Sequence, residues 1–100
     1  MGIILDEAYA ITPTRDGGYI VAGNTWSFGN GEDDVYLIKI DDNGNKIWQK
    51  TYGGSDYDEA YAITPTKDGG YIVAGGTESF GNGGWDVYLI KIDKNGNTNQ

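Results

Sequence analysis

The chain has 100 residues, the size of one small domain, and contains no cysteine and no histidine. It therefore has no disulfide framework or thiolate metal site, and it lacks the commonest general base and transition-metal ligand. The net charge of −8 argues against nucleic-acid and membrane-surface partners, because both kinds of partner attract basic surfaces.

The first half of the chain predicts four short strands joined by glycine-rich turns. Ala8–Thr12 is a short apolar strand, and the turn Thr14–Gly18 leads into a second strand at Tyr19–Gly23. The Asp-Gly and Gly-Gly pairs in this turn supply the positive φ angles that tight hairpins need. These two strands are therefore expected to form an antiparallel hairpin.

A longer glycine-rich connection over residues 26–33 precedes the third predicted strand, Asp34–Ile40. The Asn-Gly turn at Asp42–Asn45 then leads into a fourth, more polar strand, Lys46–Tyr52. No segment shows the 3.6-residue periodicity of an amphipathic helix. The sequence therefore predicts an all-β fold.

The second half of the chain repeats the first at an offset of 52 residues. Only six positions differ between Asp6–Asn45 and Asp58–Asn97: they are Arg15/Lys67, Asn24/Gly76, Trp26/Glu78, Glu32/Gly84, Asp33/Trp85 and Asp42/Lys94. A period near this length with four strands and no helix is typical of a β-propeller blade, which is a four-stranded antiparallel meander. We divide the chain into an extension at 1–5, a first blade at 6–57, and a second blade at 58–100 that lacks its outer strand.

A set of short motifs follows the chain from the fourth predicted strand into the second repeat: Thr51–Ser55, Asp58–Ala60, Asp68–Gly75, Thr77 and Ser79–Gly81. Together they resemble the β-propeller repeats of many secreted or surface-attached bacterial and archaeal proteins. The resemblance covers nearly the whole chain and implies a propeller in an extracellular or cell-surface setting, although Met1–Leu5 does not look like a signal peptide. It implies no catalytic residues. Natural members carry many repeats, whereas this chain carries two.

The third predicted strand has apolar side chains on both faces, with Val35 and Leu37 on one face and Tyr36 and Ile38 on the other. Such a strand must be covered on both sides, and propellers close with about 4–8 blades. We therefore expect the chain to partner itself, as three or four copies that close a ring. A fragment of a longer propeller and an engineered consensus pair are the alternatives.

The missing outer strand of the second blade leaves Asp86–Ile92 as a predicted sheet edge, open to pairing with another chain. Gly2–Leu5 is the only segment at the N-terminus that could supply the strand. Only Asp6 and Glu7 separate it from the first predicted strand, and two residues span at most about 7 Å. Three strand spacings require about 14 Å, so we do not expect this segment to fill the edge in the usual way.

Two connections are expected on one face of the ring: the loop between the second and third strands, and the crossover between blades. The candidate ligand-binding residues there are Trp26, Asp33, Asp56, Tyr57 and Trp85. Aromatic rings beside carboxylates suit a carbohydrate or a divalent cation. The alternative, which we favour, is that Trp26 and Trp85 pack between neighbouring blades, because Trp usually buries its large surface.

No pattern in the sequence indicates catalysis, a bound metal or a cofactor. The Asp41–Asn45 segment alternates oxygen ligands as a calcium loop does, but it lacks the later Glu and the sixth-position Gly, and Lys94 stands in the second copy. The glycine-rich connections carry no Lys-Ser or Lys-Thr of a phosphate loop. The leading hypothesis is a non-enzymatic scaffold that assembles into a propeller, and the alternative is a ligand-binding propeller module.

Overall fold

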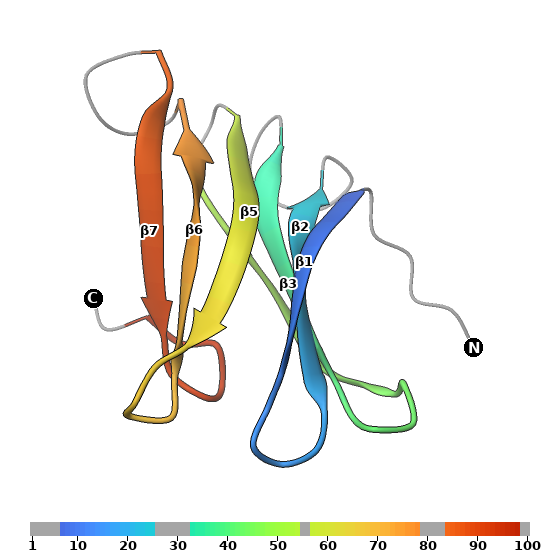
Figure 1. Ribbon diagram of the computed structural model, residues 1–100. Helices are drawn as coiled ribbons and strands as arrows, with labels where there is room; N and C mark the ends of the chain where they lie inside the picture. The colour runs from blue at the N-terminus through green and yellow to red at the C-terminus, as the bar shows by residue number, and fades with distance from the viewer. Residues whose placement is uncertain (1–6, 26–32, 55–56, 79–83, 99–100) are drawn as a thin grey trace.

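The structure is a computed structural model that describes residues 7–25, 33–54, 57–78 and 84–98. The described residues form two antiparallel sheets and no helix, and each sheet has its strands in sequence order (Figure 1). The first sheet contains β1 (Glu7–Pro13), β2 (Tyr19–Thr25), β3 (Asp34–Ile40) and β4 (Lys46–Tyr52). The second contains β5 (Asp58–Pro65), β6 (Tyr71–Thr77) and β7 (Asp86–Ile92).

The predicted all-β class is confirmed in these residues. None of them forms a helix long and apolar enough to cross a membrane. β3 and β4 have the predicted bounds. β1 runs one residue further at each end than predicted, and β2 continues to Thr25. The Gly2–Leu5 segment lies outside the described residues.

Short Asp-centred turns set the hairpin registers. In the β3–β4 turn, Asp41 Oδ1 accepts hydrogen bonds from the backbone N–H groups of Asn43 and Asn45, at 2.9 and 2.8 Å. Gly44 has a φ of +86°, which a residue with a side chain rarely adopts. These hydrogen bonds hold the pKa of Asp41 below its usual value, and the bond from the Asn45 N–H has the largest effect. The segment is therefore a self-satisfied hairpin turn, as its Asn-Gly pair predicts.

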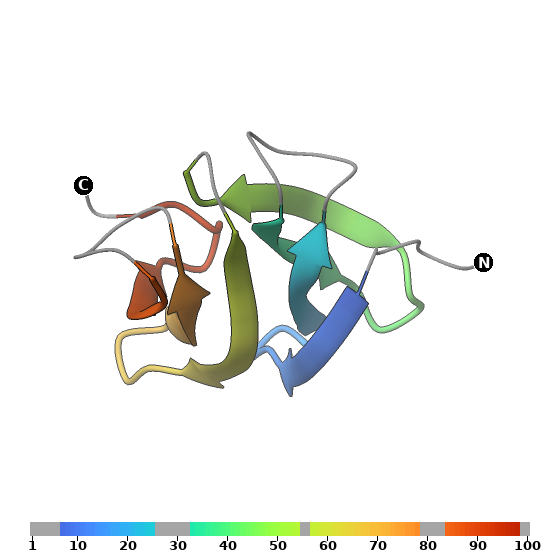
Figure 2. The same cartoon turned by 90° about the horizontal axis from the view of Figure 1, so that it is seen from above.

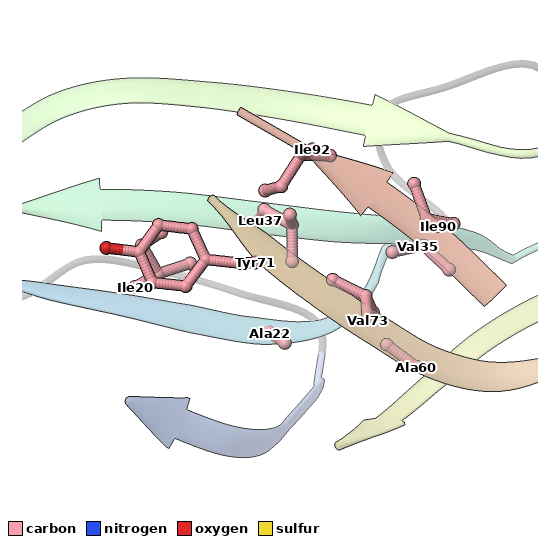
Figure 3. Packing of buried hydrophobic residues seen from close by; sticks show 9 residues of the cluster. All are labelled: Ile20, Ala22, Val35, Leu37, Ala60, Tyr71, Val73, Ile90 and Ile92. Carbon is pink, nitrogen blue, oxygen red and sulfur yellow. The ribbon is translucent and has the colours of Figure 1, made fainter. Parts of the chain in front are cut away.

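The two sheets pack face to face around one apolar core. β1 and β5 lie side by side in both views, and the rings of Tyr9 and Tyr61 lie 5.9 Å apart there (Figures 1 and 2). The core side chains come from both sheets and point toward one another in Figure 3: they are Ile20, Ala22, Val35 and Leu37 from the first sheet, and Ala60, Tyr71, Val73, Ile90 and Ile92 from the second.

β3 is the most buried strand of the chain. Its face toward the second sheet carries Val35 and Leu37, and its opposite face carries Tyr36 and Ile38, which are also almost completely buried. The pairing of Ile38 with Val21 and Gln49 places these side chains on the face turned away from the second sheet. The prediction of a third strand that is apolar on both faces is therefore confirmed.

Candidate functional site

Four core residues of the first sheet have copies on an exposed face of the second sheet. One repeat after Ile20, Ala22, Val35 and Leu37 stand Ile72, Ala74, Val87 and Leu89. The two sets lie on equivalent strands, β2 and β3 in the first sheet and β6 and β7 in the second. The copies on β6 and β7, however, lie on the face turned away from the first sheet. Val87 is 80% exposed and Leu89 is 65% exposed, whereas Val35 and Leu37 are buried. We call this surface, formed by Ile72, Ala74, Val87 and Leu89, the tail face.

The reverse relation holds on the outward face of the first sheet. Four side chains of the second sheet have their copies on this face. The core residues Tyr71, Val73 and Ile90 and the partly buried Ile63, which packs against the core, correspond to Tyr19, Val21, Ile38 and Ile11. The register pairs Val21 with both Ile11 and Ile38, so these copies share one face. Ile11 is 60% exposed and Tyr19 is 41% exposed, while Ile38 is buried. We call Ile11, Tyr19, Val21 and Ile38 the head face.

Trp85 extends the tail face. A Cβ atom added to Gly76 would lie 2.8 Å from the Trp85 ring, and the register with Val87 places that Cβ on the tail face. The Trp85 ring is half exposed there. In the first repeat, Asn24 replaces this glycine, and its Oδ1 accepts a hydrogen bond from the Ala60 N–H of the second sheet at 2.9 Å. Two of the six differences between the repeats are thus coupled through one contact.

The structure brings part of the predicted ligand-binding set together. The backbone N–H of Asp58 donates to the Asp33 carbonyl at 2.7 Å, so the loop before β3 meets the crossover before β5. The Tyr57 carbonyl accepts a hydrogen bond from the Glu78 N–H at 2.7 Å, next to the end of β6. Tyr57 is 42% exposed. Two further members of the predicted set, Trp26 and Asp56, lie outside the described residues.

Buried carboxylates at the same end of the strands were missed from sequence. Asp34 and Asp58 are almost fully buried, and Asp58 accepts hydrogen bonds from the Gly54 N–H at 3.0 Å and from the Thr77 hydroxyl. A Cβ on Gly53 would lie 2.6 Å from Asp34 Oδ1 and 2.5 Å from Asp58 Oδ2, so only glycine fits there. Burial and the charges of these two carboxylates raise the pKa of Tyr88. The network holds the crossover between the sheets.

The outer strand of the first sheet also contacts the second sheet. Trp48 packs at the margin of the core, with its ring against Gly96 in the turn after β7. The Tyr52 hydroxyl donates to the Gly96 carbonyl at 2.6 Å, and Lys50 donates to the Asn97 side chain. Burial raises the pKa of Tyr52. Trp48 therefore has a packing role between the two sheets.

The described residues offer no assembled chemistry. No three of their His, Cys, Asp or Glu side chains come together in a way that could hold a metal ion. An open groove of about 450 Å³ at the opposite end of the strands is lined by Pro, Thr and Gly of the β1–β2 and β5–β6 turns, with Arg15, Lys67 and Tyr71. It contains no carboxylate pair.

No protein-family model and no curated protein matches this chain.

Proposed function

We propose that this chain is a non-enzymatic repeat module that assembles with further copies of itself, head face to tail face, into a closed β-propeller. The supporting observation is that the chain already contains this contact once. The first sheet packs on the second through Ile20, Ala22, Val35 and Leu37, whose copies in the second repeat form the tail face. The second sheet packs on the first through side chains whose copies in the first repeat form the head face. A second chain offers each face its complement.

The exposed side chains make such a contact favourable. Val87, Leu89 and Trp85 together form an exposed apolar surface on one side of the second sheet. Removing apolar surface from water contributes roughly 25 cal/mol per Å². Because the two faces differ, the contact is heterologous, and such contacts form a ring when the rotation closes. Three or four chains would give six or eight blades, within the usual range of about 4–8.

A complementation experiment tests the proposal. Ile11→Asp blocks the head face and Leu89→Asp blocks the tail face, and both side chains are exposed in the single chain, so neither change disturbs its core. We expect each variant alone to be monomeric and an equal mixture to form a 1:1 dimer through the remaining head and tail faces. The control Asn43→Asp adds the same charge in an exposed turn and should leave the oligomer intact.

The outcome separates two kinds of contact. A like-to-like contact through one face would leave one of the blocked variants dimeric on its own, and the mixture would contain no new species. Either result, or a monomeric unmodified chain, contradicts head-to-tail assembly.

A second candidate function is carbohydrate binding at the loop end of the second sheet. Tyr57 and Trp85 are both about half exposed, and Glu78 lies beside Tyr57 through the backbone hydrogen bond described above. Aromatic faces next to polar groups suit sugar rings. Titration of the chain with oligosaccharides while following Trp fluorescence tests this, with Trp85→Phe as the control. An unchanged spectrum across glycans contradicts it.

A further inference from the structure

β3 and β7 have the same seven-residue sequence but different neighbours. β3 lies between β2 and β4, whereas in the described part of the chain β7 pairs with β6 and has no strand along its other edge. A strand edge of this kind presents a row of backbone donors and acceptors that can pair with a further strand. The chain itself therefore shows which sequence pairs with this heptapeptide, namely that of β4.

The register for an added strand is already set by the turn after β7. The Asp93 N–H donates to the Asn97 carbonyl at 2.9 Å, as the Asp41 N–H does to Asn45 in the first repeat. An isolated bridge then joins Ile92 to Thr98. It repeats the Ile40–Lys46 pair with which β4 begins on β3. The edge of β7 is thus arranged as the edge of β3 is.

We infer that the outer edge of β7 is a binding site for an extended peptide segment with the sequence pattern of β4. On β3, that strand places Trp48, Lys50 and Tyr52 beside Lys39, Leu37 and Val35, all on the face toward the second sheet. This pattern of two aromatic residues around a long polar one is the recognition element. Large side chains at alternate positions give an added strand its side-chain contacts.

The receiving side chains on β7 are in place. The residues that correspond to Lys39, Leu37 and Val35 are Lys91, Leu89 and Val87. Leu89 and Val87 are largely exposed, so a bound aromatic side chain would remove apolar surface from water as well as adding backbone pairing. A polar or β-branched segment without the aromatic pair would gain only the backbone contacts.

The edge site does not rest on self-assembly. In the first sheet, β4 occupies the edge of β3 while the second sheet covers the face of β3, so an edge strand and a face partner are compatible. The edge of β7 should bind its peptide in the unmodified chain and equally in the Ile11→Asp variant, in which head-to-tail contact is blocked.

A peptide titration tests the inference. The probe is a capped synthetic peptide with the sequence of Ile47–Tyr52, which begins after the position that Thr98 already occupies, and it is added to the ¹⁵N-labelled full chain. We expect saturable amide shifts concentrated in Val87–Lys91 and slower hydrogen exchange of those amides, with little change in β3. A control peptide exchanges Trp48 with Gln49 and Thr51 with Tyr52. It has the same composition but presents its aromatic rings on the other face, and it should bind about tenfold more weakly.

A chain variant localises the site. When residues after Thr98 are replaced by the sequence of Ile47–Tyr52, the chain carries its own edge strand, and peptide binding should be lost. Equal binding of both peptides, shifts that avoid β7, binding that survives in the extended chain, or no binding to the Ile11→Asp variant would each overturn the inference. None of these outcomes depends on whether the unmodified chain forms a ring.

Discussion

Leu37 and Leu89 occupy the same position in two identical heptapeptides, yet Leu37 is fully buried and Leu89 is 65% exposed. The difference comes from the neighbour: the second sheet covers the face that carries Leu37, and the described residues place nothing comparable over Leu89. The first sheet thus shows, within one chain, how the exposed face of the second can be covered.

The two leucines should respond differently to truncation. In the Ile11→Asp background, where assembly is blocked, Leu37→Ala should lower the free energy of unfolding by about 2–5 kcal/mol, because it opens a cavity in the core. Leu89→Ala should change it by less than about 0.5 kcal/mol, as is usual for exposed sites. Urea denaturation of the three proteins measures both values. Equal losses for the two variants would show that the faces are not distinguished as described.

Gly96 and Gly44 form a matched pair that isolates the Trp48 contact. Both have left-handed φ angles, +83° and +86°, so alanine introduces similar backbone strain of about 1–3 kcal/mol at either site. A Cβ at Gly96 would also lie 2.9 Å from the Trp48 ring, whereas nothing lies within 4 Å at Gly44. Gly96→Ala should therefore lower the melting temperature more than Gly44→Ala does. Equal melting temperatures would mean that Trp48 does not rest on this turn.

Removing the Asn24 side chain should weaken the contact between the sheets. Asn24→Ala leaves the N–H of Ala60 without its 2.9 Å acceptor in a buried position, which costs about 1–3 kcal/mol. Chemical denaturation measures this loss, and hydrogen exchange at Ala60 should become faster in the variant. If exchange at Ala60 is unchanged, the hydrogen bond does not hold β5 to the first sheet.

Because the pKa of Asp68 is lowered in the folded chain, we expect the fold to lose stability in acid. A hydrogen bond from the Thr66 hydroxyl, contacts with Lys91 and a bond from the Gly70 N–H lower the pKa of Asp68 to about 2, from an ordinary value of 3.8. A depressed folded-state pKa stabilises the fold above the ordinary value, and that contribution disappears as pH falls from about 4 toward 2. Carboxyl-carbon NMR should give a midpoint near 2. A midpoint at the ordinary value would show that these contacts do not persist in solution.

A charge variant completes this prediction. Asp68→Asn lacks the titrating carboxyl, so its stability should fall less than that of the unmodified chain over the same pH interval. Asp16, the copy of Asp68, has its pKa lowered by the same kinds of contact, here from Thr14, Lys39 and Gly18. Asp16→Asn should therefore behave in the same way, and parallel behaviour of both variants is the expected result.

Sequence patterning anticipated the strands because their signals are local. The Asn-Gly and Asp-Gly turns fix the hairpins at Gly44 and Gly17, both with left-handed φ angles. The apolar run of Asp34–Ile40 marks a strand that is covered on both faces, but it does not determine which face meets the second sheet. The near-identical second repeat then predicts β5, β6 and β7 from β1, β2 and β3. These features need no knowledge of distant contacts.

Long-range contacts were not visible in the sequence. The approach of Asp34 and Asp58 around Gly53 joins residues from two sheets and a crossover, and no local pattern encodes it. A glycine pair followed by Asp at the crossover is the one signal that could have suggested a tight polar junction. Likewise, the coupling of Gly76 to Trp85 appears as two unrelated substitutions until the register aligns them.

Self-association should depend on salt. Each chain carries a net charge of −8, so bringing copies together costs electrostatic repulsion that added salt screens. Sedimentation velocity in increasing sodium chloride should show tighter association. Weakening with salt would indicate that ion pairs, and not the apolar head and tail faces, hold the copies together.

The most direct test of head-to-tail assembly is the absolute mass of the unmodified chain, measured by light scattering after size exclusion over a range of protein concentrations. We expect a single species of three or four times the chain mass of 10.8 kDa, dissociated by Leu89→Asp. A compact, folded particle with the mass of one chain at every concentration would contradict the account.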